Sequence, residues 1–177
     1  MPSPSPELDA LYAAVDAAAG ELHRHHAAAL ACRRGCAGCC VDGVTVFEVE
    51  ADAIRARQAA VLRQAPAPEG ACAFLDDAGG CRIYADRPYV CRTQGLPLRW
   101  LDELDGQPVE YRDVCPLNEA VGVEALPPEA CWSLGPVEGR LQELQRREHG
   151  ELRRVALRDL FTGVGGRTDS RGASHSE

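Results

Sequence analysis

The stretch that organises this chain is Cys32-Arg-Arg-Gly-Cys36-Ala-Gly-Cys39-Cys40. It places four cysteines within nine residues, a density that chance clustering explains poorly. Thiolates bind soft and borderline metal ions, and two cysteines separated by two or three residues can close on one ion when the turn between them exposes both sulfurs. Gly35 and Gly38, each beside a cysteine, give the backbone that freedom. The stretch therefore predicts a fold organised around a cysteine-bound metal.

Five further cysteines follow this stretch. Cys72, Cys81 and Cys91 fall within twenty residues, and Cys115 and Cys131 come later in the chain. A free cysteine can also pack as a small hydrophobic residue, and this alternative stays open above all for Cys115 and Cys131. Eight of the nine cysteines would suffice for two four-sulfur sites. The candidate metal ligands are Cys32, Cys36, Cys39, Cys40, Cys72, Cys81, Cys91 and Cys115.

The composition limits the functions open to the chain. Its 177 residues suit a single domain. Only 5% of them are aromatic, so the large side chains that dominate core energetics are scarce and we expect something besides apolar burial to stabilise the fold. All 19 basic residues are Arg, which excludes a Schiff-base lysine and a phosphate-loop lysine. The net charge is -8 and no run of Arg is interleaved with aromatic residues, so we expect no nucleic-acid partner.

The cellular compartment bears on how the cysteines are used. The beginning of the chain has no basic segment followed by an apolar one, and nowhere do 18 apolar residues run together. We therefore expect a cytoplasmic protein with no membrane partner. In a reducing compartment, nine cysteines are poor candidates for structural disulfides, and an odd number leaves one unpaired. Metal ligation is the leading use for them.

The pattern along the chain predicts the domain organisation. We expect a disordered arm at residues 1–6, a single cysteine-cluster domain at 7–161 with its motif core at 32–95, and a disordered tail at 162–177. Apolar residues at helical spacing predict helices from Leu8 to near Gly35, at about 50–64 and at about 137–161.

The remaining segments predict short strands and turns. A strand is expected at 44–47, and hairpins at 72–84 around Gly79-Gly80 and at 96–112 around Asp105-Gly106. Asp86 is expected to cap a one-turn helix that reaches Cys91. The fold class is α+β: a small, mainly helical domain with short hairpins and irregular loops around a cysteine metal site.

Basic side chains near the cysteines are candidates for stabilising a negatively charged metal centre. Four thiolates around Zn²⁺ or a [4Fe–4S]²⁺ core leave a net charge of about −2, which nearby cations would stabilise. Arg33, Arg34, Arg82, Arg87 and Arg92 all lie close in sequence to a cysteine. We expect Arg87 and Arg92 to be buried cofactor-binding partners, and Arg33 and Arg34 to be solvent-facing.

Three histidines lie upstream of the cysteines. His23 and His26 would share a helix face, as two metal ligands three residues apart can. However, the cysteines already supply enough ligands, and histidine near the C-terminal end of a helix is also favoured by the helix dipole. We therefore do not expect His23, His25 or His26 to bind the metal.

Adjacent cysteines raise a separate expectation. Neighbouring side chains on an extended backbone point to opposite sides, so Cys39 and Cys40 should not reach the same ion easily. We expect the two residues to have different roles.

Three segments resemble a known family. They are Cys36-Ala-Gly-Cys39-Cys40, Cys72-Ala-Phe-Leu75 and Cys81-Arg-Ile-Tyr-Ala-Asp-Arg-Pro-Tyr-Val-Cys91-Arg92. Together they resemble the YkgJ-type cysteine-cluster family, also described as the CxxCxxCC zinc- or iron-chelating domain. The resemblance covers about residues 32–95. Its first spacing here is Cys-x-x-x-Cys instead of Cys-x-x-Cys, which leaves Cys32 the least certain of the first four cysteines.

The resemblance implies three functions. The first is an iron–sulfur protein, with a 4Fe–4S cluster and a redox partner, acting in electron transfer or beside an oxidoreductase. The second is a structural zinc module that recruits a partner protein. The third is a cluster-dependent enzyme related to flagellin lysine N-methylases, for which Cys32-x-x-x-Cys36-x-x-Cys39 has the spacing of radical S-adenosylmethionine enzymes. Against the third, the motif does not open a run of alternating strands and helices.

Overall fold

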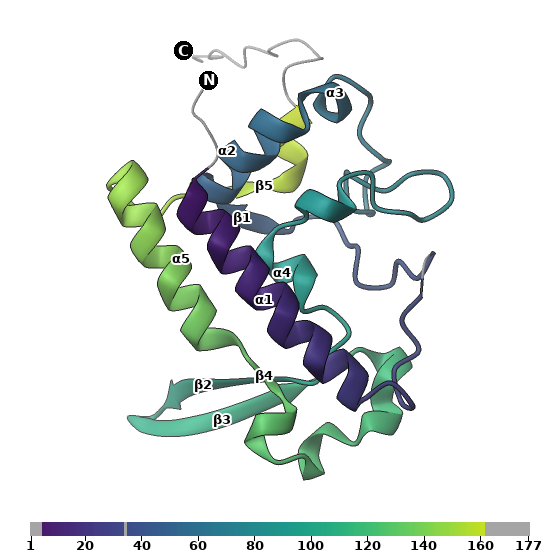
Figure 1. The fold of residues 1–177 in the computed structure, drawn as a ribbon, viewed down its shortest axis with the longest axis vertical. Coiled ribbons are helices and arrows are strands. Elements are labelled where there is room, and N and C mark those ends of the chain that lie inside the picture. The colour runs from purple at the N-terminus through teal and green to yellow at the C-terminus, as the bar shows by residue number, and fades with distance from the viewer. Residues whose placement is uncertain (1–4, 34, 162–177) are drawn as a thin grey trace, which may run out of the picture.

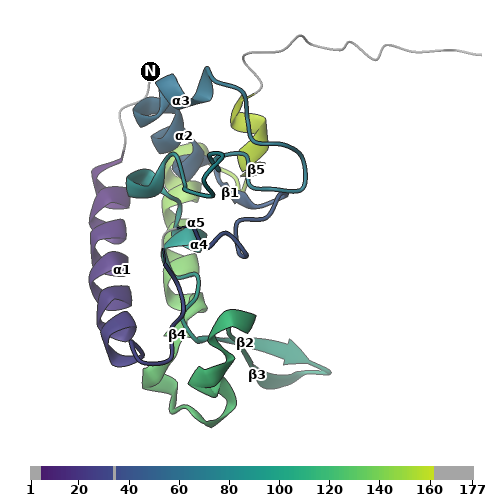
Figure 2. The same cartoon turned by 90° about the vertical axis from the view of Figure 1, so that its right-hand side faces the viewer.

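Helix α1 (Pro6–His25), with 20 residues, is the longest helix that the structure describes. The computed structural model describes residues 5–33 and 35–161, so the expected tail, most of the expected arm and Arg34 lie outside the described residues. Pro6 occupies the first turn, where a missing N–H costs nothing, and Glu7 and Asp9 complement the helix dipole there. In Figures 1 and 2, α1 runs beside α5 (Leu134–His149), and the two helices carry much of the core.

The helix predicted to reach Gly35 ends ten residues earlier, so that prediction is wrong at its C-terminal end. His26 follows the last helical residue, and its ring lies 2.7 Å from the carbonyl oxygen of Ala130. Five residues later, the N–H of Ala31 donates to the side chain of Asn118 instead of a helical carbonyl. Two long-range partners thus compete with the helix. Cys32 consequently lies in an irregular segment.

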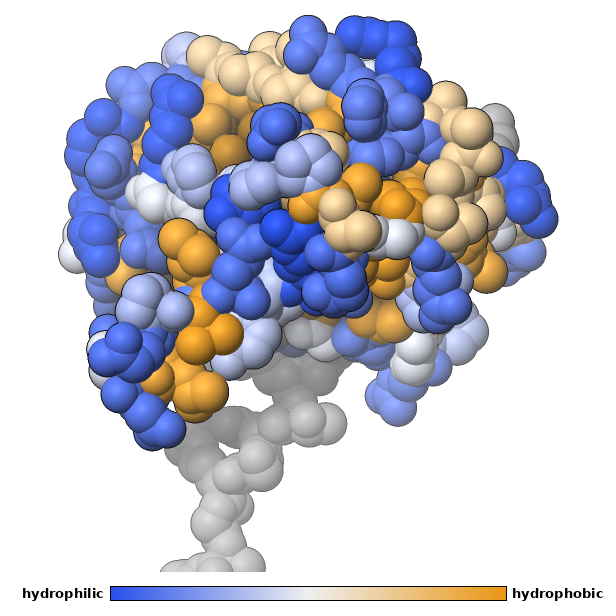
Figure 3. All heavy atoms as spheres, turned by 90° about the horizontal axis from the view of Figure 1, so that it is seen from below, coloured by the Kyte–Doolittle hydropathy of each residue, from blue (hydrophilic) through white to orange (hydrophobic). Residues whose placement is uncertain are grey.

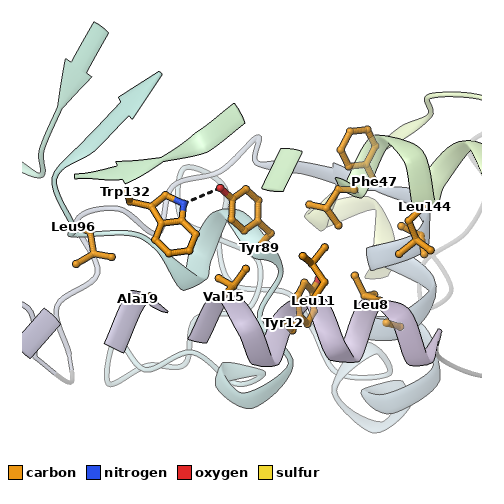
Figure 4. Packing of buried hydrophobic residues seen from close by; sticks show 13 residues of the cluster. Leu8, Leu11, Tyr12, Val15, Ala19, Phe47, Tyr89, Leu96, Trp132 and Leu144 are labelled. Carbon is orange, nitrogen blue, oxygen red and sulfur yellow. Dashed lines mark hydrogen bonds between the residues drawn. The ribbon is translucent and has the colours of Figure 1, made fainter. Parts of the chain in front are cut away.

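The larger core cluster lies between α1 and α5. Figure 4 shows its side chains, with the Nε1–H of Trp132 donating to the Tyr89 hydroxyl at 2.9 Å. This bond satisfies the polar atoms of two aromatic residues that are otherwise buried. The buried members of the cluster are Leu8, Leu11, Tyr12, Val15, Ala19, Phe47, Val49, Ala53, Tyr89, Leu96, Trp132, Leu141 and Leu144.

A second core cluster is built around a two-stranded sheet. Strand β1 (Thr45–Phe47) was predicted from sequence, and it pairs antiparallel with β5 (Arg154–Ala156). Helices α2 (Glu48–Arg57) and α3 (Ala59–Leu62) follow β1 and occupy the range predicted for one helix, with a break at Gln58. Phe74 and Phe161 meet in this cluster with ring centroids 4.8 Å apart.

The helix predicted at 137–161 is also shorter than expected. Gly150 adopts a left-handed conformation with φ of 76°, which ends α5 at His149. The chain then forms β5 and a 3₁₀ helix at Leu157–Phe161. Pairing with β1 supplies backbone partners that a continued helix would not reach, and it buries Val155 and Leu160.

The predicted hairpin around Asp105-Gly106 is confirmed. Strands β2 (Leu98–Leu104) and β3 (Gln107–Asp113) pair in register with Leu104 opposite Gln107, and β4 (Trp132–Ser133) lies parallel to β2. Asp105 and Gly106 both have positive φ, 52° and 74°, as a tight two-residue hairpin turn requires. Figures 1 and 2 show this hairpin projecting from the end of the molecule where α1 ends.

The cysteine-bearing segments have little regular structure. Residues 72–84 form a turn with one bridge between Leu75 and Cys81, instead of a full hairpin, and the N–H groups of Asp76 and Arg82 close it by donating to the carbonyls of Gly80 and Phe74. A 3₁₀ helix (Tyr84–Asp86) and helix α4 (Tyr89–Arg92) follow. Asp86 does not cap α4 as expected, because its carboxylate accepts from the side chain of Gln58 at 2.5 Å and pairs with Arg57.

The whole is an α+β fold, as predicted from sequence. Of the helices that the structure describes, none is both long and apolar enough to cross a membrane. The surface seen in Figure 3 mixes hydrophilic residues with smaller hydrophobic areas. The large hydrophobic side chains that are exposed are Val41, Tyr84, Leu101, Leu104, Tyr111, Leu117 and Leu152.

Candidate metal centre

Eight of the nine cysteines line one cavity of about 900 Å³. They are the eight that the sequence analysis proposed as ligands, Cys32, Cys36, Cys39, Cys40, Cys72, Cys81, Cys91 and Cys115. Cys131 is buried and is not among the residues that line the cavity. Apolar side chains, among them Leu30, Val44 and Phe74, complete much of the remaining wall. The fold therefore gathers thiols from segments more than 80 residues apart in sequence.

Two turns and one bridge place the first cysteines beside Cys72. The N–H of Cys36 donates to the carbonyl of Arg33, and the N–H of Cys40 donates to that of Ala37, each at 2.9 Å. The carbonyl of Cys40 then accepts from the N–H of Cys72, also at 2.9 Å. These bonds hold the two cysteine segments side by side without a sheet.

Helix α4 brings Cys91 to the cavity, and Glu50 fixes the start of that helix. The carboxylate of Glu50, on α2, accepts from the N–H of Tyr89 at 2.9 Å, from the hydroxyl of Tyr12 at 2.8 Å and from the N–H of Phe47 at 3.1 Å. Burial raises the pKa of Glu50, and the three donors oppose that effect. Glu50 therefore ties α1, α2 and α4 together behind the cysteines.

Five of the thiols form an inner group with coupled charges, namely Cys39, Cys40, Cys72, Cys81 and Cys91. Burial, with a smaller contribution from the neighbouring thiolates of Cys72, Cys81 and Cys39, raises the pKa of Cys91 to about 12. Burial also raises the pKa of Cys81, with a further contribution from Cys72. Thiolates that lie close together in a partly buried site raise one another's pKa by mutual repulsion.

Cys39 and Cys40 do not point to opposite sides, so that expectation is wrong. Residues 38 and 39 lie in a turn, so the backbone is not extended there. Both side chains line the cavity, and the S–H of Cys40 donates to the sulfur of Cys39. This hydrogen bond lowers the pKa of Cys39 to about 6 and raises that of Cys40. The hydrogen bond thus favours the state in which one sulfur of the pair is a thiolate and the other holds the proton.

The two candidate arginines both pair with Asp16 on α1, Arg87 at 3.5 Å and Arg92 at 2.5 Å, but only Arg87 lines the cavity. Arg87 lines the cavity, donates to the carbonyl of Tyr84 at 2.9 Å and lies with its guanidinium 4.2 Å from the centre of the Tyr84 ring. Its charge acts to lower the pKa of Cys81 against the larger effect of burial. Arg92 is not among the residues that line the cavity, and its guanidinium lies 3.9 Å from the centre of the Tyr12 ring.

Of the other basic residues near the cysteines, some line the cavity and others do not. Arg33 lines the cavity, whereas Arg82 donates to the carbonyls of Ala65 and Ala73. Of the histidines, His23 also lines the cavity, and burial lowers its pKa, helped by the charge of Arg87. His26 lies 2.7 Å from the Ala130 carbonyl and has no place in the cavity wall.

Sequence reasoning missed two residues that organise the site, Glu50 and Asn118. Asn118 is fully buried, and its side chain lies 3.3 Å from the sulfur of Cys32. The neighbouring sequence predicts neither role. Glu50 resembles any acidic residue of an amphipathic helix, and Asn118 resembles an ordinary loop residue. Apart from Phe47, which is three residues from Glu50, the side-chain partners of these two residues are 23 to 87 residues away in sequence.

The donor set fits a soft metal centre. The eight cysteines in the cavity wall supply sulfur, the ligand that zinc and iron–sulfur clusters share, and His23 and Asp76 are the other residues of metal-ligating type there. Within residues 5–33 and 35–161, no three Cys, His, Asp or Glu side chains stand at the spacing of a closed metal site.

Comparison with known proteins identifies the motif. Residues 31–115 match the family model CxxCxxCC, described as "Putative zinc- or iron-chelating domain". The chain carries a CxxCxxCC domain. No curated protein and no solved structure matches the chain. The CxxCxxCC domain begins one residue before Cys32 and ends at Cys115, so it spans the eight cysteines of the cavity and excludes Cys131. Generic metal binding, of zinc or iron, follows from this family.

Proposed function

We propose that the CxxCxxCC domain holds iron–sulfur clusters in the cysteine cavity and serves electron transfer, alone or beside an oxidoreductase. The observation that carries the proposal is the convergence of eight thiols on one cavity of about 900 Å³. One zinc ion takes four ligands and little space. Eight thiols match the demand of two four-cysteine clusters, whose inorganic sulfides also need room.

Particular residues would supply the ligands and the surroundings. The inner group of Cys39, Cys40, Cys72, Cys81 and Cys91 would supply the first thiolates, because those charges already act on one another. A cluster bound there would supply one-electron chemistry.

The cavity wall would tune that chemistry. Arg87 places a positive charge near Cys81, and Leu30, Val44 and Phe74 exclude water from part of the wall. Positive charge and hydrogen bonds raise the reduction potential of a cluster, and a dry surrounding lowers it. The partner expected for such a centre is a redox protein.

A structural zinc site is the second candidate, and one observation favours it. The segments that carry Cys36, Cys39, Cys72 and Cys81 contain turns and isolated bridges, and no helix or strand of their own. A closed Cys₄ zinc site contributes folding free energy to such segments outright. In that case the domain would present a surface to a partner protein.

Purification without oxygen distinguishes the two candidates. The protein would be analysed for iron, zinc and acid-labile sulfide per chain, and its visible spectrum recorded before and after dithionite. The proposal predicts iron and sulfide in equal amounts and a broad absorption that dithionite bleaches. Full zinc with no sulfide would overturn the iron–sulfur assignment. Cys131→Ser is the matched control, because Cys131 lies outside the cavity, and it should change none of these values.

A further inference from the structure

We propose that Asn118 is a positioning residue that holds the sulfur of Cys32 in the metal cavity, from a segment outside the CxxCxxCC domain. The inference rests on the proposed metal binding by the cavity cysteines. Asn118 follows the last residue of the matched domain by three positions, in the 3₁₀ segment Pro116–Val121. It is 0% exposed, a rare state for an amide side chain that must satisfy all its hydrogen bonds.

Every polar atom of this side chain is used. Its Oδ1 accepts from the N–H of Ala31 at 2.8 Å. Its Nδ2 donates to the carbonyl of Gly95 at 2.7 Å and to the sulfur of Cys32 at 3.3 Å. The orientation of the amide follows from these partners, because one side faces an N–H donor and the other faces two acceptors. Only an amide offers one acceptor and two donors in this arrangement.

The backbone of Asn118 joins a third segment to the same point. Its N–H donates to the carbonyl of Cys115 at 2.7 Å. Asn118 therefore links the segment before Cys32, the turn after α4 and the last cavity cysteine. These three segments are otherwise irregular, and Cys32 itself is exposed. The contact with Asn118 thus constrains the Cys32 sulfur in a segment that has no helix or strand of its own.

Gly95 leaves the space that the Cys32 sulfur occupies. Its φ of 89° favours glycine, and a Cβ built on it would overlap the sulfur of Cys32 and come within 3.4 Å of Asn118 Nδ2. Gly95 thus leaves room for the Cys32 sulfur, and Asn118 donates a hydrogen bond to it. Hydrogen bonds to ligand sulfurs orient metal ligands, and losing one costs about 10- to 100-fold in metal affinity.

The test uses Asn118→Asp in the full chain, which keeps the acceptor for Ala31 and removes both donors. Metal-loaded protein is treated with iodoacetamide, and each cysteine is followed by peptide mass spectrometry. We expect Cys32 to be labelled about 10 to 100 times faster than in the parent protein. The inner group, Cys39, Cys40, Cys72, Cys81 and Cys91, should stay protected.

Gln145→Glu is the matched control. Gln145 is also 0% exposed, accepts from the N–H of Val49 and donates to the carbonyl of Glu151, so the change removes the same kind of donor far from the cysteines. Its cysteines should label as in the parent. Equal labelling of all cysteines in both variants would overturn the proposal, because Asn118 would then act only through global stability. Unchanged labelling of Cys32 in Asn118→Asp would overturn it as well.

Gly95→Ala keeps the proposal testable if Asn118→Asp does not fold. This change leaves Asn118 in place and displaces the Cys32 sulfur, so the same selective labelling of Cys32 is expected. If Cys32 stayed protected in Gly95→Ala, the proposed positioning of its sulfur by Gly95 and Asn118 would be contradicted. Failure of metal binding itself has a different signature, since the parent protein would then label at all cavity cysteines with and without added metal.

Discussion

The carboxylate of Glu50 lies 2.9 Å from the backbone nitrogen of Tyr89 and accepts its hydrogen bond, two residues before Cys91. A buried acid on α2 thus sets where α4 begins, and α4 carries one cysteine of the inner group. The bond also couples the metal cavity to the main core, because Tyr89 accepts from Trp132 through its hydroxyl. Substitution of Glu50 should therefore change both the stability of the fold and the position of Cys91.

Glu50→Gln should make stability less dependent on pH. Burial raises the pKa of Glu50 in the folded chain above its unfolded value of about 4.3. The resulting stabilisation is fully present below pH 4.3 and is lost as pH rises through the folded pKa. The glutamine variant does not titrate and loses one acceptor, which costs about 1–3 kcal/mol. Its deficit against the parent should be largest near pH 4 and should shrink toward pH 8.

Urea unfolding of both proteins between pH 4 and 8, under the same metal loading, measures this difference. Other groups titrate alike in parent and variant, so they cancel in the comparison, apart from Tyr12, which bonds directly to Glu50. A deficit that grows with pH would show that the three donors stabilise the carboxylate more than burial destabilises it.

Arg87→Gln should shift metal uptake to higher pH. Burial raises the pKa of Cys81, and the Arg87 charge partly offsets that effect, so its removal raises the pKa further. A thiol must lose its proton to bind metal. We expect the apparent affinity at pH 7 to fall about threefold, as a partly exposed charge pair of roughly 0.5–1 kcal/mol implies. Titration with Zn²⁺ against a competing chelator from pH 6 to 9 measures it.

Arg92→Gln is the contrasting variant. The Arg92 guanidinium is bound to Asp16 and lies over the Tyr12 ring, away from the cavity. We expect a loss of about 1–3 kcal/mol in the free energy of unfolding and an unchanged pH profile of metal uptake. The reverse pattern, with Arg92 moving the profile and Arg87 only the stability, would contradict both assignments.

Cys39 should be the most reactive thiol of its pair. The S–H donated by Cys40 lowers the pKa of Cys39 to about 6, whereas Cys40 keeps its proton. In metal-free protein at pH 7, iodoacetamide should therefore modify Cys39 before Cys40. Cys40→Ala removes the donor and should slow modification of Cys39 several-fold, because the loss of thiolate outweighs the greater nucleophilicity of a thiolate with a higher pKa. An unchanged rate would mean that the hydrogen bond does not govern this thiol.

Metal removal should loosen the middle of the chain and spare the long helices. Residues 36–43 and 70–81 contain turns and two isolated bridges, while α1 and α5 bury apolar faces against each other. Hydrogen exchange after chelation should show faster exchange across these cysteine segments, with α1 and α5 still protected. Equal protection of the cysteine segments with and without metal would argue against coupling of metal binding to folding.

The sequence by itself determined the parts of this protein that local spacing controls. The β2–β3 hairpin follows from Asp105-Gly106, whose two positive φ angles few other pairs adopt. The strand at Thr45–Phe47 and the eight cavity cysteines were likewise readable from residue type and spacing. These features depend on neighbours a few residues apart, so no knowledge of the fold is needed to predict them.

Only the tertiary structure decided where the long helices end and what surrounds the thiols. Helix α1 ends early because partners more than 80 residues away bind His26 and Ala31, and the chain after α5 is extended because β1 offers a strand partner. Asn118 and Glu50 acquire their roles in the same way. A buried donor or acceptor must find a partner wherever the fold supplies one, and the spacing of residues along the chain does not say which partner that is.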